Sequence, residues 1–203
     1  LCCFDGQCAD CCLDRTCLND KNTYPLLMLH GHSFLTYFPT EPLSDMFSKI
    51  QYQMLQDGYV DAGILDFRNL RHYEGEGISS LNNPLMFRAS YYDDSYYNLG
   101  SYIYVTKKND NIDIYAIRLS EIIHLIRDVT GRDKVNIVAH SMGGLVVRRY
   151  AQIFGSEYLD NVILIATPNN GVEGRIKHIC SLVGEKKECD DMSKGSVFLS
   201  KLN

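Results

Sequence analysis

The chain has 203 residues, of which 45% are hydrophobic and 22% are charged, and its formal net charge is −5 at pH 7. This length and composition can bury one sizeable core. The negative net charge, with no basic run longer than two residues, as at Lys107-Lys108, argues against nucleic acid and anionic membrane surfaces as main partners. No apolar run approaches the roughly 20 residues that cross a bilayer. The chain begins at Leu1 rather than at a methionine, so we expect a piece of a longer protein.

Eight cysteines fall into two groups. Six lie in residues 1–20, a Cys-rich segment ahead of a domain at 21–203, and two lie near the other end: Cys2, Cys3, Cys8, Cys11, Cys12, Cys17, Cys180 and Cys189. The even number in each group predicts three disulfides in the first segment and a Cys180–Cys189 bridge, and therefore an extracellular or cell-surface location. The alternative is a zinc or iron–sulfur site, because Cys8 and Cys11 form a C-x-x-C pair.

In the first half of the chain, apolar patterns predict three strands and one helix. The strands are expected at 25–30, 59–67 and 85–92, and the helix at 42–56. The first run is apolar throughout and ends before Gly31, which is typical of a strand buried on both faces. The helix has apolar residues at helical spacing, with Pro42 suited to its first turn and Gly58 to its end. Residues 68–84 predict a loop.

The second half of the chain alternates in the same way. Strands are expected at 102–106, 134–139 and 161–166, and helices at 111–130 and from Met142 to about Phe154. In the first of these helices, Ile114 and Ile117 are predicted on the same face as Ile122 and Ile126. Strands alternating with helices predict a mostly parallel sheet with helices on both faces. In such sheets, chemistry gathers at the carboxyl ends of the strands.

Ser141 stands between a predicted strand and a predicted helix, in the sequence Ala139-His140-Ser141-Met142-Gly143-Gly144. Small residues two before and two after a serine at such a junction are typical of a nucleophile elbow, a turn too tight for larger side chains. The hydroxyl then lies near a helix N-terminus, where N–H groups stabilise developing negative charge. The pattern predicts Ser141 as a catalytic nucleophile, and the alternative is an ordinary serine N-cap.

His30-Gly31-His32 follows the first predicted strand and indicates a second part of the same site. Acyl transfer needs N–H donors directed at the tetrahedral oxyanion. In an elbow arrangement, one donor is the N–H of the residue after the nucleophile, here Met142, and the other comes from the loop after an earlier strand. Gly31 lets that loop approach closely, so the backbone N–H groups of His32 and Met142 are the predicted oxyanion hole. The alternative is an unrelated strand–glycine–loop, which is common in α/β proteins.

The strand ending in LLMLHG and the AHSMGG turn together resemble the α/β-hydrolase lipases and esterases, especially small secreted triacylglycerol lipases and inositol-deacylase-like proteins. The likeness runs from about Tyr24 to Thr167 in order and spacing. It implies an α/β-hydrolase fold and a serine hydrolase that cleaves carboxylic esters, lipid-like ones, through an acyl-enzyme on Ser141. No cofactor or metal is expected, and the expected partners are an ester or lipid substrate and a lipid interface. The alternatives are an acyltransferase with the same machinery and a non-catalytic surface binding protein of this fold.

The resemblance also implies a catalytic acid and a histidine that follow the serine in chain order. The only histidine after Ser141 is His178, in a predicted amphipathic helix at 175–183. This helix fits a lid at 170–191, or a surface loop joined by the predicted disulfide, better than it fits a catalytic base. We therefore expect the acid and the base beyond Asn203 and a fold incomplete at its C-terminal side. The 203 residues alone are expected to be nearly inactive.

Overall fold

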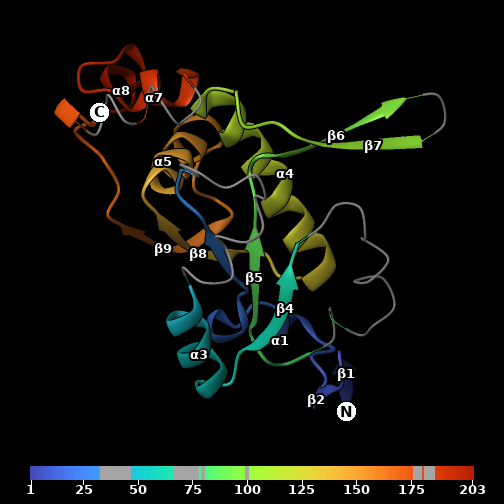
Figure 1. The fold of residues 1–203 in the computed structure, drawn as a ribbon. Helices are drawn as coiled ribbons and strands as arrows, with labels where there is room; N and C mark the ends of the chain where they lie inside the picture. Colours follow the sequence, from blue (N-terminus) through green and yellow to red (C-terminus); the bar gives the residue numbers. More distant parts are fainter. Residues whose placement is uncertain (33–46, 66–77, 79–80, 99–100, 176–179, 181–185) are drawn as a thin grey trace.

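The computed structural model describes residues 1–32, 47–65, 78, 81–98, 101–175, 180 and 186–203. Five parallel strands form the central sheet, in the order β4-β5-β3-β8-β9 (Figure 1). They are β3 (Leu26–Leu29), β4 (Val60–Ile64), β5 (Leu85–Ala89), β8 (Val135–His140) and β9 (Leu159–Ile165). The predicted parallel sheet is confirmed, and β3 lies at its centre.

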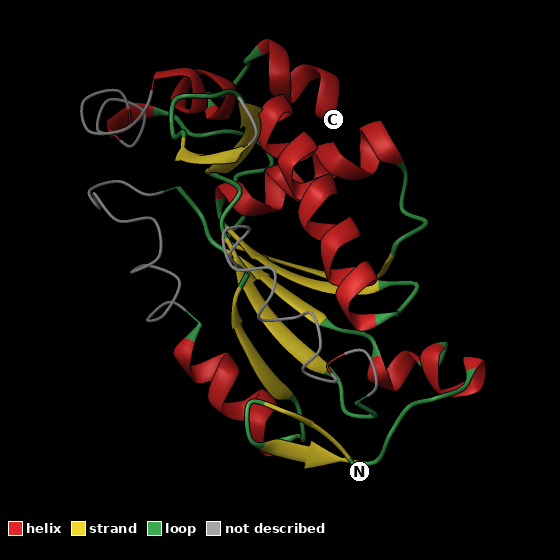
Figure 2. Ribbon diagram, turned by 90° about the vertical axis from the view of Figure 1, so that its right-hand side faces the viewer, coloured by secondary structure: helices red, strands yellow, loops and turns green. Residues whose placement is uncertain are grey.

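Helices cover both faces of this sheet (Figure 2). The residues of β3 alternate between the two layers. Leu27 and Leu29 belong to the main hydrophobic core, together with buried residues of α4 (Ile112–Thr130) and α5 (Met142–Phe154). Leu26 and Met28 belong to a second cluster, which packs against α3 (Ser48–Gln56). Because successive side chains of a strand point to opposite faces, the short strand β3 contacts both helical layers.

The remaining helices lie at the two ends of the sheet (Figure 1). On the side toward which the arrows of β4 and β5 point are α7 (Lys186–Met192) and α8 (Val197–Leu202). At the opposite end lie α1 (Arg15–Leu18) and a 3₁₀ turn at Lys21–Thr23. Within the described ranges, no helix combines the length and the apolar character needed to cross a membrane.

The helix predicted at 111–130 is confirmed as α4, but two residues of its predicted buried face are wrong. Ile114 is 37% exposed and Ile117 is 44% exposed, whereas Ile122 and Ile126 are fully buried. Apolar residues occur around most of this helix, so spacing alone does not single out the face that meets the sheet and α5. The buried face instead consists of Ile112, Tyr115, Ala116, Arg118, Leu119, Ser120, Ile122, Ile123, Ile126 and Thr130.

The helix predicted at 42–56 is described only from Phe47 onward, because residues 33–46 lie outside the described part of the chain. Its end agrees with the prediction, since Gly58 adopts φ +88° directly after α3. A positive φ of this kind is readily available only to glycine. Most of the loop predicted at 68–84 also lies outside the described residues.

The sequence between β5 and α4 forms an antiparallel ribbon of β6 (Asp93–Asn98) and β7 (Ser101–Thr106), separate from the central sheet (Figure 1). The strand predicted at 85–92 is therefore too long, since β5 ends at Ala89. The apolar strand predicted at 161–166 is β9, whose side chains are more exposed than those of a strand buried on both faces. Val162 is 39% exposed and Ile163 is 56% exposed, because β9 is an edge strand of the described sheet.

All eight cysteines form disulfides, which confirms the disulfide prediction and leaves no thiolate for the metal-site alternative. The pairs are Cys2–Cys11, Cys3–Cys8, Cys12–Cys17 and Cys180–Cys189. The first two close the hairpin of β1 (Cys2–Phe4) and β2 (Gln7–Ala9). Phe4 of this hairpin is 1% exposed and packs on the main core, so the Cys-rich segment contributes an apolar anchor as well as cross-links.

The burial pattern of α4 predicts that two isoleucine replacements lower the free energy of unfolding by different amounts. Ile122→Ala removes a fully buried side chain and is expected to lower the free energy of unfolding by about 2–5 kcal/mol. Ile117→Ala is expected to lower it by less than about 1 kcal/mol, because that side chain is largely exposed. Urea unfolding of both variants tests the comparison, and equal losses would show that the exposed face has been assigned wrongly.

Candidate active site

Ser141 lies where β8 ends and α5 begins, at the carboxyl edge of the sheet. Its backbone has φ 52° and ψ −123°, and its side chain makes no capping hydrogen bond to α5. A positive φ is costly for a residue with a Cβ. Among the described non-glycine residues, only Asp5 and Ala166 share it. The N–H of Ser141 donates to the carbonyl of Ile165 at 2.8 Å, which holds this strained turn against the end of β9.

The turn at Ser141 and the turn after β3 are in van der Waals contact. A Cβ on Gly31 would lie 2.8 Å from the Cβ of Ser141. A Cβ on Gly143 would lie 2.4 Å from the carbonyl oxygen of His30. Real Cβ atoms do not come that close, so glycine is required at both positions by the approach of the two turns. The structure thus brings Gly31 and Ser141, which were singled out separately in the sequence, into direct contact.

His30 is buried beneath this contact, and its imidazole is neutral. Its Nδ1 donates to the carbonyl of Gly31 at 2.6 Å, while Nε2 accepts from the hydroxyl of Ser90 at 3.2 Å. The ring stacks on Tyr91 with centroids 4.3 Å apart, and the Tyr91 hydroxyl donates to the His30 carbonyl at 3.0 Å. Burial lowers the pKa of His30 to about 4. His30 therefore shapes the turn that carries Gly31 and His32.

His32 points its imidazole into the protein, toward α7. Its Nε2 lies 2.9 Å from a carboxylate oxygen of Glu188, and the side chains are 2% and 1% exposed. Glu188 also accepts from the hydroxyl of Tyr115 and, at 3.4 Å, from that of Tyr92. Burial raises the pKa of Glu188, while these three donors act in the opposite direction.

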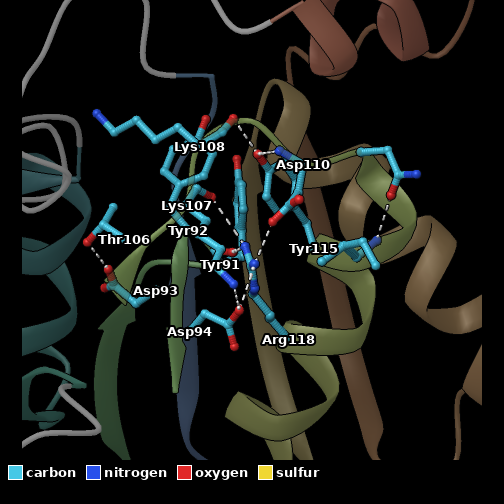
Figure 3. A network of polar contacts seen from close by, with 12 residues as sticks. Tyr91, Tyr92, Asp93, Asp94, Thr106, Lys107, Lys108, Asp110, Tyr115 and Arg118 are labelled. Carbon is cyan, nitrogen blue, oxygen red and sulfur yellow. Dashed lines mark hydrogen bonds and ion pairs between the residues drawn. The ribbon is translucent and has the colours of Figure 1, made fainter. Parts of the chain in front are cut away.

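The tyrosines beside Glu188 are held by a polar network around Arg118 of α4 (Figure 3). Arg118 donates to the carbonyl of Tyr91 at 3.3 Å and forms ion pairs with Asp94 at 3.1 Å and Asp110 at 2.6 Å. Its guanidinium also lies 5.6 Å from the ring centre of Tyr115. This network joins the β6–β7 ribbon to α4. It also holds Tyr91 and Tyr115, which pack beside His30 and Glu188.

Sequence reasoning did not find Glu188 and Tyr115 as neighbours of the site. Glu188 precedes Cys189, one half of the predicted disulfide, and that bridge was the only signal that the segment is fixed in place. The middle of the proposed lid, including His178, lies outside the described residues. Within the predicted lid, Glu188 and Cys189 are buried against the core.

One described group could bring three metal-binding side chains together: His32, Cys180 and Cys189. The two cysteine sulfurs are joined in a disulfide, and the third member faces Glu188. A disulfide sulfur is not the thiolate that zinc or an iron–sulfur cluster requires. These residues therefore do not fit a metal centre.

Residues 82–177, which include Ser141, match the family model described as alpha/beta hydrolase fold. Aspergillus fumigatus lipase B superposes with a TM-score of 0.51 and 11% identity over 92% of this chain and 35% of the lipase. Phospholipase PlaB from Legionella pneumophila, in complex with thio-NAD, superposes with a TM-score of 0.50 and 16% identity over 89% of this chain and 33% of the phospholipase. A comparison with curated proteins found no match.

The chain has the α/β-hydrolase fold. Its five parallel strands and the strand–turn–helix at Ser141 are features of this fold. The chain spans about a third of the length of these two structures. At 11% and 16% identity, the likeness establishes the fold and not the substrate.

The low pKa of His30 predicts a loss of stability in mild acid. As the pH falls, a histidine in the unfolded state becomes protonated around its pKa of 6.5, whereas native His30 stays neutral to about pH 4. The unfolded state therefore binds the extra proton first. Between pH 7 and 5, His30 is expected to cost about 2 kcal/mol of unfolding free energy. His30→Asn retains a donor for the Gly31 carbonyl without titrating, so its stability should fall less over that range.

Urea unfolding at both pH values measures this difference. His124→Asn is the matched control, because His124 is exposed on α4 and its replacement should leave the pH dependence unchanged. Equal pH dependence in wild type and His30→Asn would contradict a buried neutral imidazole.

Proposed function

We propose that this protein is a serine hydrolase that cleaves carboxylic esters of a lipid-like kind through an acyl-enzyme on Ser141. The observation that carries the proposal is the backbone of Ser141, which has a positive φ between β8 and α5 while its side chain leaves the helix uncapped. A serine present only for capping would accept a hydrogen bond from the first turn of α5. The backbone of Ser141 is strained although its side chain makes no such bond, which supports a role for the hydroxyl other than capping the helix.

The proposed oxyanion hole consists of the backbone N–H groups of His32 and Met142. Met142 is the first residue of α5, where N–H groups have no acceptor within the helix. His32 follows Gly31, which lies against Ser141, and this proximity supports its N–H as the second donor. Two such donors, each contributing about 3–4 kcal/mol, together with the positive end of the helix dipole, favour negative charge beside Ser141.

In the proposed reaction, the Ser141 oxygen attacks the ester carbonyl carbon while its proton passes to a general base. The tetrahedral oxyanion collapses, the C–O bond to the alcohol breaks, and the alcohol leaves with that proton. Water then attacks the acyl carbon in the same way, so a carboxylic acid is released and Ser141 regains its proton. The two N–H groups stabilise the oxyanion in both steps.

Neither His30 nor His32 is expected to be the general base. The two ring nitrogens of His30 contact Gly31 and Ser90, and Nε2 of His32 faces Glu188. In this fold, the acid and the histidine follow the nucleophile in chain order. We therefore retain the expectation that both come from sequence after Ser141 and outside the described site.

The substrate class rests on the structures with the same fold. Their names describe a lipase and a phospholipase. Four disulfides support an oxidising, extracellular setting, since such cross-links persist mainly outside the cytosol. A secreted esterase that meets lipid at an interface is consistent with both observations.

A fluorophosphonate probe, which reacts with activated serines, tests the proposal in the full-length protein. Wild type is expected to be labelled at Ser141 and to hydrolyse p-nitrophenyl esters. Ser141→Ala should lose the label and at least about a thousandfold of the hydrolysis rate, because the acyl-enzyme then has no nucleophile.

Ser156→Ala is the matched control, because Ser156 is an exposed serine in the turn after α5 and should leave both readouts unchanged. Folded wild-type protein that neither reacts with the probe nor hydrolyses esters would exclude the enzyme and favour a non-catalytic binding protein. The 203 residues alone are expected to show little turnover, so strong Ser141-dependent activity there would show that the base lies within them.

A further inference from the structure

Glu188 is a buried carboxylate whose partners come from three separate elements. His32 follows β3, Tyr92 follows β5, and Tyr115 belongs to α4. Only 1% of Glu188 is exposed. A carboxylate removed from water is costly unless donors surround it. Here the imidazole of His32 and the hydroxyls of Tyr115 and Tyr92 surround the carboxylate, so the fold provides a specific polar site for this side chain.

Glu188 is held on a rigid support. The next residue, Cys189, is bonded to Cys180, and both are 1% exposed. Asp191 accepts from the backbone N–H of Ile112 at 2.9 Å, which ties the same helix to the start of α4. The hydroxyl of Ser193 donates to the Cys189 carbonyl at 2.7 Å. The position of the carboxylate is therefore fixed by a disulfide and by hydrogen bonds of the residues that follow it.

The side chain that Glu188 contacts belongs to the residue whose N–H is assigned to the oxyanion hole. The imidazole and the N–H of His32 are attached to the same Cα. Holding the ring at Nε2 therefore restrains the rotation of the adjacent peptide as well. On the other side of that peptide, Gly31 has no side chain with which to resist rotation. The carbonyl of the same peptide is held by Nδ1 of His30 at 2.6 Å, so the buried ring of His32 is a second anchor for the direction of the N–H.

We propose that Glu188 is a positioning residue: through the imidazole of His32 it fixes the backbone N–H that stabilises the oxyanion. The inference rests on the proposed function of Ser141. Preorganised donors are effective because they do not have to reorient as charge develops, so loosening this N–H lowers the rate of the chemical step. Substrate binding to the rest of the site should change little.

The central experiment compares Glu188→Gln with wild type in the full-length protein. The amide retains the shape of the side chain but loses its charge and presents an NH₂ group to donors. The rate of Ser141 labelling and kcat for p-nitrophenyl esters are expected to fall by about tenfold to a hundredfold, less than the loss of an oxyanion donor outright. KM is expected to stay within about twofold.

Asp190→Asn is the matched control. It removes the same charge from the same helix at an exposed position, so kcat, KM and labelling should stay as in wild type. Hydrogen exchange at the His32 amide supplies a readout that needs no activity. It should be about tenfold faster in Glu188→Gln and unchanged in Asp190→Asn.

A second pair of variants tests whether Glu188 acts through His32. His32→Gln retains a donor near the position of Nε2, whereas His32→Leu removes it at similar volume. The glutamine variant should therefore react about tenfold faster than the leucine variant. In the His32→Leu background, Glu188→Gln should cause no further loss, because the contact through which it acts is already gone.

The outcomes separate the two proposals. An unreactive folded wild type overturns the function of Ser141, while faster amide exchange in Glu188→Gln would still support the positioning role. A reactive wild type with equal kcat and equal exchange in Glu188→Gln overturns the positioning role alone, as does a loss confined to KM. If Glu188→Gln does not fold, equal rates for His32→Gln and His32→Leu overturn it.

Discussion

The contact between two backbone turns at the carboxyl edge of the sheet determines the geometry of the candidate site. β3 and β8 are neighbours in a register that pairs Leu29 with Ala139. Two residues farther along each strand, Gly31 and Ser141 therefore reach the edge at the same level. The missing side chain of Gly31 lets the turns close to van der Waals distance. Strand pairing, rather than any side-chain interaction, thus sets the distance between the proposed nucleophile and the proposed oxyanion loop.

A second layer of buried polar groups supports these turns, and burial disfavours the charged form of both of its titratable members, His30 and Glu188. Burial keeps His30 neutral, so that its two ring nitrogens can serve as one donor and one acceptor. Burial also disfavours the charge on Glu188, but His32, Tyr92 and Tyr115 surround that carboxylate with donors. Low dielectric strengthens satisfied hydrogen bonds and penalises missing ones. The turns are consequently held by buried groups whose displacement would break hydrogen bonds at a large cost in free energy.

The sheet, the order of its elements and the disulfides could be predicted from the sequence because each leaves a local signal. Apolar runs, helical spacing and an even cysteine count are such signals, and the sequence around Ser141 specifies a strand–turn–helix. The exposed positions of Ile114 and Ile117 left no such signal, because the face of α4 that is buried depends on where α5 packs. The contact of His32 with Glu188 joins residues far apart in sequence. No spacing rule encodes a contact of that range.

The strained backbone of Ser141 needs the support of the groups around it. A non-glycine residue with φ 52° persists only when its surroundings stabilise it by more than the strain costs. Here the N–H of Ser141 is bonded to β9, Gly31 and Gly143 allow close approach, and buried polar groups hold the loop opposite. Because α7 is itself fixed by the Cys180–Cys189 disulfide, the support reaches from the sheet to a cross-linked helix. Rigidity at this edge is thus supplied by α7 and its disulfide as well as by the residues that touch Ser141.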